Sequence, residues 1–286
     1  MKKEKGEKRK EKGERRKGGI SLIIKKLRCK TMNSIAIRGT AYFASDFHFG
    51  APDVGASRER ETAILRWLDE ISSDCDHLFL LGDIFDFWFE YRDVVPKGYF
   101  RFFSKLLEMK EKGTEIYYFT GNHDMWVKCY FADELGVQIF RTPQEFEING
   151  KRCYIGHGDG LDSRDRGYLL MKKIFAFKPN IMLYGALPPR WAFSIARFCS
   201  RSSRAQNSKP HSKNEEKARK QEQATLEFIR NILKNSKIDY FIFGHRHLPM
   251  QVEVAPNVTY FNTGDWLKHN TFLRLGGDGA VLKVNR

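Results

Sequence analysis

Long apolar runs and paired cysteines are both missing from this chain of 286 residues. No stretch reaches the roughly 20 apolar residues that a membrane-spanning helix needs, so no such helix is expected. The five cysteines are odd in number and form no CxxC pair, which argues against a zinc ribbon. We interpret them as free thiols in a reducing compartment.

Acidic residues are outnumbered, and the imbalance is concentrated at one end. The chain has a formal net charge of +15, but residues 1–31 hold 14 Lys and Arg against 4 Glu, a net of +10. This end shows no apolar periodicity, so we expect residues 1–33 to form a disordered basic extension. Its apolar stretch Ile20–Ile24 is too short for a secretory signal. A solvated extension is favoured over nucleic-acid or anionic-membrane binding, and no nucleic-acid partner is expected.

Apolar residues make up 41% of the chain, enough for a packed core. After the extension, strand-like and helix-like stretches alternate. The predicted strands are Thr40–Ser45, His77–Leu81 and Glu115–Thr120, and the helices between them are Arg58–Ser72 and Phe100–Lys112. This rhythm predicts an α/β fold in which helices cover a parallel sheet.

Short strands dominate the rest of the domain, which we take as residues 34–286. Asn149-Gly150 is a strong hairpin signal between two of them. The predicted strands are Val137–Phe140, Gln144–Ile148, Arg152–Ile155, Val258–Phe261, Thr271–Leu275 and Ala280–Val284. They predict a second, mostly antiparallel sheet packed on the first.

Residues 166–236 break this pattern because they are helical, basic and rich in aromatic side chains. We expect a helical insertion that covers the functional site as a cap. Plain core packing also explains its apolar residues, and Tyr184–Phe198 has the character of a helix that lies on a membrane surface.

Five segments of the chain end an apolar, β-prone run with metal-ligand residue types. The runs are AYFAS, HLFLL, IYYFT, CYI and YFIF. The polar residues that follow them are Asp46 and His48, Asp83 and Asp86, Asn122 to Asp124, His157, and His245 and His247. Strand ends of an α/β sheet meet at one edge, so these side chains are expected to lie together.

Seven of these side chains suit a dinuclear metal centre. Asp46 and His48 lie two apart on an extended segment and face the same way, and the Asp83 carboxylate is able to bridge two ions. Asn122, His157, His245 and His247 complete the set. Nitrogen and oxygen ligands without thiolate favour Mn²⁺, Fe²⁺ or Zn²⁺. Two such ions about 3.5–4 Å apart predict hydrolysis of a phosphoester or phosphoanhydride.

The five segments resemble the signature of the calcineurin-like metallophosphoesterase superfamily: D-x-H, G-D-x-x-D, G-N-H-[DE], G-H and G-H-x-H. The resemblance implies a four-layer α/β/β/α sandwich with a dinuclear site and a helical cap insertion. It places Asp46, His48, Asp83 and His247 on one ion. It places Asp83, Asn122, His157 and His245 on the other.

The same resemblance implies that His123 binds no metal and acts as a proton donor or charge stabiliser beside the scissile phosphate. Asp124 would orient the His123 ring, and Asp86 would orient a ligand. A turn-capping role is the alternative for both carboxylates.

Within the superfamily, the chain is similar to the UDP-2,3-diacylglucosamine pyrophosphohydrolase family of lipid A biosynthesis. GDIFDFWFEYR (82–92), HGDGLDSRDRGY (157–168) and FGHRH (243–247) carry this likeness over about residues 40–275. It implies Mn²⁺ as cofactor and an amphiphilic nucleotide-sugar lipid as substrate. It also implies a cytoplasmic enzyme, peripheral on the inner membrane of a Gram-negative type cell.

Candidate substrate-binding residues follow from this likeness. They are Asn122, His123, Arg58, Ser203, Arg204 and His245. The best-known branch of the family has GNRD where this chain has GNHD at 121–124, so His123 replaces an arginine. The alternative is a phosphodiesterase or phosphatase that acts on a soluble nucleotide or a phosphoprotein.

Overall fold

The computed structural model describes residues 34–207 and 211–285, without the side chains of residues 201–217. The predicted extension 1–33 and the side chains of Ser203 and Arg204 therefore lie outside the described residues. The helices are α2 (Val54–Ile71), α3 (Phe100–Glu111), α4 (Tyr130–Leu135), α5 (Arg166–Ala176), α6 (Lys178–Gly185), α7 (Pro189–Asn207) and α8 (His211–Leu233). The strands are β1 (Ile35–Ile37), β2 (Ala41–Ala44), β3 (His77–Leu80), β4 (Glu115–Phe119), β5 (Gln138–Phe140), β6 (Gln144–Ile148), β7 (Lys151–Ile155), β8 (Tyr240–Phe243), β9 (Pro249–Ala255), β10 (Val258–Thr263), β11 (Thr271–Gly276) and β12 (Gly279–Val284).

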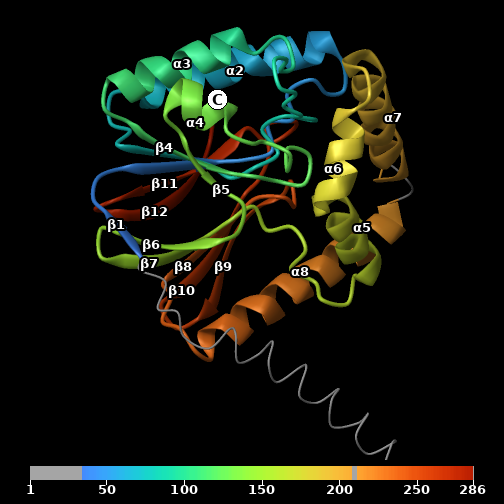
Figure 1. The fold of residues 1–286 in the computed structure, drawn as a ribbon. Coiled ribbons are helices and arrows are strands. Elements are labelled where there is room, and N and C mark those ends of the chain that lie inside the picture. The colour runs from blue at the N-terminus through green and yellow to red at the C-terminus, as the bar shows by residue number, and fades with distance from the viewer. Residues whose placement is uncertain (1–33, 208–210, 286) are drawn as a thin grey trace, which may run out of the picture. The chain divides into compact units, whose positions relative to one another are not determined.

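Two six-stranded sheets lie face to face (Figure 1). The first has the order β12-β11-β2-β3-β4-β5, and the second has the order β1-β6-β7-β8-β10-β9. In the first sheet β2, β3 and β4 are parallel, as the alternation of strands and helices predicts. β5 continues this parallel order next to β4. The carboxyl ends of β2, β3 and β4 therefore meet at one edge.

The alternation of side chains along each strand produces the layers. In β2, Tyr42 and Ala44 face a core shared with α2, α3 and α4, whereas Ala41 and Phe43 face the core between the two sheets. A third core joins the second sheet to α8, where Ile229 is fully buried. The sequence of layers is α/β/β/α, as expected.

Two sequence expectations about the second sheet are wrong. Val258–Phe261 lies in it, but Val137–Phe140, Thr271–Leu275 and Ala280–Val284 correspond to β5, β11 and β12 of the first sheet. The second sheet is also mixed, because β7, β8 and β10 run parallel to one another. Alternation along a strand gives the faces that it presents, but it does not give the sheet that the strand joins.

Four helices, α5 to α8, occupy residues 166–233 between β7 and β8. Figure 1 shows α5, α6 and α7 along one side of the two sheets, while α8 runs across the outer face of the second sheet. We call α5, α6 and α7 the inserted helices. None of the helices within the described residues has both the length and the apolar character needed to cross a membrane.

Candidate metal centre

The five sequence segments converge at the carboxyl ends of β2, β3, β4, β7 and β8. Backbone hydrogen bonds join the first two segments, because the amide of His48 donates to the Asp83 carbonyl over 2.9 Å. Glycines make this packing possible. A Cβ at Gly121 would overlap the Asp83 carboxylate, and one at Gly244 would overlap the side chain of Ser45. The glycine in each of these motifs is therefore required by the closeness of a neighbouring loop.

The first ligand group contains Asp46, His48 and His247. Nε2 of His247 lies 3.4 Å from Oδ1 of Asp46, and Nε2 of His48 lies 3.6 Å from the same oxygen. Nε2 of His48 is also 3.8 Å from Oδ2 of Asp83. These separations between donor atoms suit one cation with ligand bonds of about 2.0–2.2 Å.

The second ligand group contains Asp83, His157 and His245. Nε2 of His157 lies 3.4 Å from Oδ2 of Asp83 and 3.3 Å from Oδ1 of Asn122. The same Asp83 oxygen therefore faces both groups. A carboxylate oxygen in this position would be able to bridge two ions.

The atoms of the two carboxylates that face away from the centre are held by the surrounding loops. Oδ2 of Asp46 accepts hydrogen bonds from the His245 amide over 2.9 Å and from the Ser45 hydroxyl. Oδ1 of Asp83 accepts from the His123 amide over 2.8 Å. Each carboxylate therefore keeps one oxygen directed at the ligand groups.

Two histidines are also held by hydrogen bonds to neighbouring residues. Nδ1 of His157 donates to the Leu81 carbonyl over 2.7 Å, and Nδ1 of His247 donates to Oδ2 of Asp265 over 3.3 Å. Such partners fix the tautomer that leaves Nε2 free for a metal. Sequence reasoning missed Asp265, although it follows the β-prone run of β10 as the predicted ligands follow theirs.

Unpaired buried atoms test whether a cation fits this arrangement. Oδ1 of Asp46, Nε2 of His48 and Nδ1 of His245 are buried and have no hydrogen-bond partner within the described residues. Leaving such atoms unsatisfied is costly. Two divalent cations would satisfy them, so the donor set fits a dinuclear centre.

The charge balance of the centre also favours bound cations. Burial acts to raise the pKa of Asp46, but the imidazoles of His247 and His48 bring that pKa well below its usual range. Burial acts to lower the pKa of His48 and of His157, but the neighbouring carboxylates raise both values to about 10. Without metal, protons on these histidines neutralise the buried carboxylates. Bound cations would displace those protons.

The backbone at the centre is strained. Five ligand residues have φ in the left-handed region that favours glycine: Asp46 at 57°, His48 at 45°, Asp83 at 52°, His245 at 70° and His247 at 54°. Such conformations cost about 1–3 kcal/mol each and persist where the surrounding structure requires them. Their concentration at these segments is typical of a functional site.

His123 lies beside the first ligand group, and its ring is oriented differently from our expectation. Nδ1 donates to the carbonyl oxygen of Asp86 over 3.0 Å. Asp124 instead accepts from the amides of Gly121 and Ile84 and from the Tyr118 hydroxyl, so it holds the loop and does not contact the ring. The predicted role of Asp124 as orienter of the His123 ring is therefore wrong, and Asp86 has this role.

Arg58, a candidate for substrate binding, projects from α2. Its side chain is 61% exposed, and its guanidinium lies 3.5 Å from Glu61 on the same helix. Among the described residues it makes no contact with the ligand groups.

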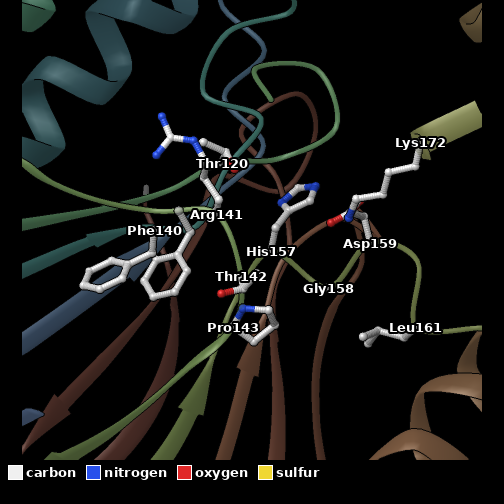
Figure 2. A pocket seen from close by; sticks show the side chains of 11 residues that line it. Thr120, Phe140, Arg141, Thr142, Pro143, His157, Gly158, Asp159, Leu161 and Lys172 are labelled. Atoms are coloured by element: carbon white, nitrogen blue, oxygen red, sulfur yellow. The ribbon is translucent and has the colours of Figure 1, made fainter. Parts of the chain in front are cut away.

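A pocket lies beside His157, at the side of the second ligand group (Figure 2). Thr120, Arg141 and Thr142 line it from the loops that follow β4 and β5. On the opposite side Lys172 of α5 pairs with Asp159 over 2.5 Å. The pocket thus combines hydroxyl and cationic groups next to the centre, which suits a polar or anionic ligand.

The inserted helices carry an unusual number of exposed apolar side chains. They are Leu170, Met171, Ile174, Phe175, Phe177, Met182, Leu183, Trp191, Ile195 and Phe198. Soluble monomers rarely display this much clustered apolar surface without a binding role.

Comparison with known proteins gives consistent matches. The model of the family described as "calcineurin-like phosphoesterase" matches residues 40–249. A UDP-2,3-diacylglucosamine hydrolase of Porphyromonas gingivalis is 32% identical, over 86% of this chain and 98% of the relative. Proteins of the same name are 27% identical in Azotobacter vinelandii, over 85% of this chain and 97% of theirs, and 26% identical in a Shewanella species, over 84% and 95%.

Replacing Asp83 tests whether this one carboxylate serves both ligand groups. Asp83→Ala should lose both ions and lower the rate of bis(p-nitrophenyl) phosphate hydrolysis to background, because one carboxylate serves both groups. Metal content after dialysis, measured by mass spectrometry, checks this. Asp93→Ala, at a side chain that is 84% exposed, is the matched control. Retention of both ions by Asp83→Ala would contradict the bridging role.

Replacing Asp265 tests the orientation of His247. Asp265→Asn keeps an acceptor for the amides of Lys268 and His269 but presents an NH₂ group to Nδ1 of His247. We expect metal affinity to fall about 10- to 100-fold. Asp278→Asn, at an exposed carboxylate paired with Arg274, should leave the affinity unchanged in the same titration. An unchanged affinity in Asp265→Asn would remove Asp265 from the centre.

Proposed function

This chain belongs to the calcineurin-like phosphoesterase family, and we propose that it hydrolyses the pyrophosphate of UDP-2,3-diacylglucosamine to UMP and 2,3-diacylglucosamine 1-phosphate. The oxygen of Asp83 that faces two ligand groups is the observation that supports metal-assisted cleavage at phosphorus most directly. The relatives' shared name supports the substrate.

The proposed reaction is attack of water on the α-phosphorus and cleavage of its bond to the bridging oxygen. Two divalent ions, when bound, supply an activated nucleophile and stabilise charge on the phosphoryl oxygens. Asp46, His48, Asp83 and His247 would hold one ion. Asp83, Asn122, His157 and His245 would hold the other. The mixed nitrogen and oxygen ligands are compatible with Mn²⁺, Fe²⁺ or Zn²⁺, and the family resemblance favours Mn²⁺ among them.

His123 is the proposed proton donor to the leaving oxygen. Its side chain is 23% exposed beside the buried ligands, so it is accessible to a substrate. Nδ1 donates to the Asp86 carbonyl, which leaves Nε2 as the nitrogen available for proton transfer. We also propose that Asn122, His123 and His245 contact the phosphates.

The inserted helices are proposed to form the cap that receives the acyl chains. We limit the cap to α5, α6 and α7, because α8 packs on the second sheet as the fourth layer. Their exposed apolar side chains support an acylated substrate, since each buried methylene contributes about 0.8 kcal/mol. The same apolar surface supports placement of the enzyme on the cytoplasmic face of an inner membrane.

A product assay tests the substrate. With Mn²⁺, the purified protein should release UMP from UDP-2,3-diacylglucosamine, and mass spectrometry should detect both products. Cleavage of bis(p-nitrophenyl) phosphate without UMP release would favour the alternative, a phosphodiesterase or phosphatase with a soluble substrate.

A second variant tests the role of His123. His123→Ala should lower kcat by about 10²-fold or more because the proton donor is lost. Its metal content should stay at the wild-type level, because His123 is not a proposed ligand. His77→Ala, at the amino end of β3 where the imidazole bonds to the Arg38 carbonyl, is a matched control for histidine removal. Metal loss in His123→Ala would make His123 a ligand and overturn the assignment.

A further inference from the structure

Asp86 is a buried carboxylate whose two oxygens face different parts of the molecule. It lies in the loop after β3 and is only 8% exposed. Its amide donates to the Phe49 carbonyl over 3.0 Å, which fixes its backbone against the loop after β2.

One side of Asp86 faces the functional centre. Its Oδ1 lies 3.6 Å from Nδ1 of His48 and 3.6 Å from Nδ1 of His123. Its carbonyl accepts the hydrogen bond from Nδ1 of His123. Both the main chain and the side chain of Asp86 therefore set the position of the His123 ring.

The other side of Asp86 faces the inserted helices. The hydroxyl of Ser200, on α7, donates to Oδ2 of Asp86 over 2.7 Å. Ser200 is only 7% exposed, so water does not readily replace this bond. Hydrogen bonds to a charged acceptor are stronger than those between neutral groups. The contact joins residues 114 positions apart in the chain.

We propose that Ser200 is a positioning residue that couples the seating of helix α7 to the orientation of the His123 ring through Asp86. This rests on the proposed function of His123 in cleavage at phosphorus. When α7 is packed against the loop after β3, the Ser200 hydroxyl binds Oδ2 of Asp86. Oδ1 and the carbonyl oxygen of Asp86 are then held in one position beside the His123 ring.

Loss of the bond from Ser200 to Asp86 should change the orientation of the His123 ring more than that of the His48 ring. His48 belongs to the first ligand group, and it also lies with Asp86 and His123 in a third set of possible ligand atoms that are within 4.8 Å of one another. In the proposed assignment, bound metal would fix the His48 ring from the Nε2 side. His123 is not a proposed ligand, and the contacts of its ring nitrogens within the described residues are those with Asp86. Disturbing Asp86 therefore moves the proton donor and leaves the ligands in place.

The test compares Ser200→Ala with Ser194→Ala on the same helix, where the hydroxyl bonds to the Arg190 carbonyl of its own helix. The substrate is diphenyl phosphate, which has no acyl chain for a cap to bind and whose phenolate leaving group, unlike p-nitrophenolate, depends on a proton donor. We expect Ser200→Ala to lower kcat about 10-fold, with KM and metal content unchanged. Ser194→Ala should behave as wild type. If Ser200→Ala reduces the soluble yield, Ser200→Cys, with a weak donor of similar size, is measured in the same way.

A double-variant cycle separates positioning from a structural role. In a His123→Ala background, Ser200→Ala should cause no further loss, because both changes affect the same proton transfer. An unchanged kcat in Ser200→Ala, a further loss in the double variant, or loss of metal would each overturn the proposal. Because the assay needs no lipid substrate, its outcome is independent of whether UMP is released from UDP-2,3-diacylglucosamine.

Discussion

The buried carboxylate of Asp83 is the feature on which the rest of the centre depends. One oxygen faces both ligand groups, and the other accepts the His123 amide. A buried charge of this kind needs cationic partners on every open side, or its desolvation would be prohibitive. The histidines around it, the strained backbone and the glycine at 121 all bring compensating groups close to that charge.

Two further carboxylates connect this centre to the inserted helices. On one side Asp86 accepts the Ser200 hydroxyl of α7. On the other side Asp159 accepts hydrogen bonds from Tyr168 over 2.8 Å and from Lys172 over 2.5 Å, both on α5. Aromatic packing also attaches these helices, because Tyr184 contacts Phe87, Phe89 and Trp126 from the loops after β3 and β4. Many of their other apolar side chains are exposed. This arrangement leaves the apolar surface available for a ligand, while hydrogen bonds hold α5 and α7 in position beside the metal centre.

The sequence was sufficient to predict that the candidate ligand residues lie together, because their signal is local. A β-prone run followed by Asp, Asn or His places that side chain at a sheet edge, and the same rule would have found Asp265 after β10. Contacts set by packing were not predictable. The bond from Ser200 to Asp86 joins residues 114 positions apart in the chain. Asp124 was assigned to the His123 ring from the family resemblance, which does not give the hydrogen bonds of this loop. The sheet that β11 and β12 join was also missed, because the alternation of side chains along a strand is the same in either sheet.

The histidine at position 123 is the main departure from the related GNRD motif, and the structure gives it a physical consequence. An arginine supplies a fixed positive charge and does not release a proton under ordinary conditions. An imidazole whose Nδ1 donates to the Asp86 carbonyl presents a single nitrogen, Nε2, and under the proposed function this nitrogen would give up a proton as charge develops on the leaving oxygen. This hydrogen bond also fixes the direction of Nε2, which a long arginine side chain would not need. A chain that uses histidine here therefore depends more strongly on the position of Asp86, and through it on Ser200, than one that uses arginine.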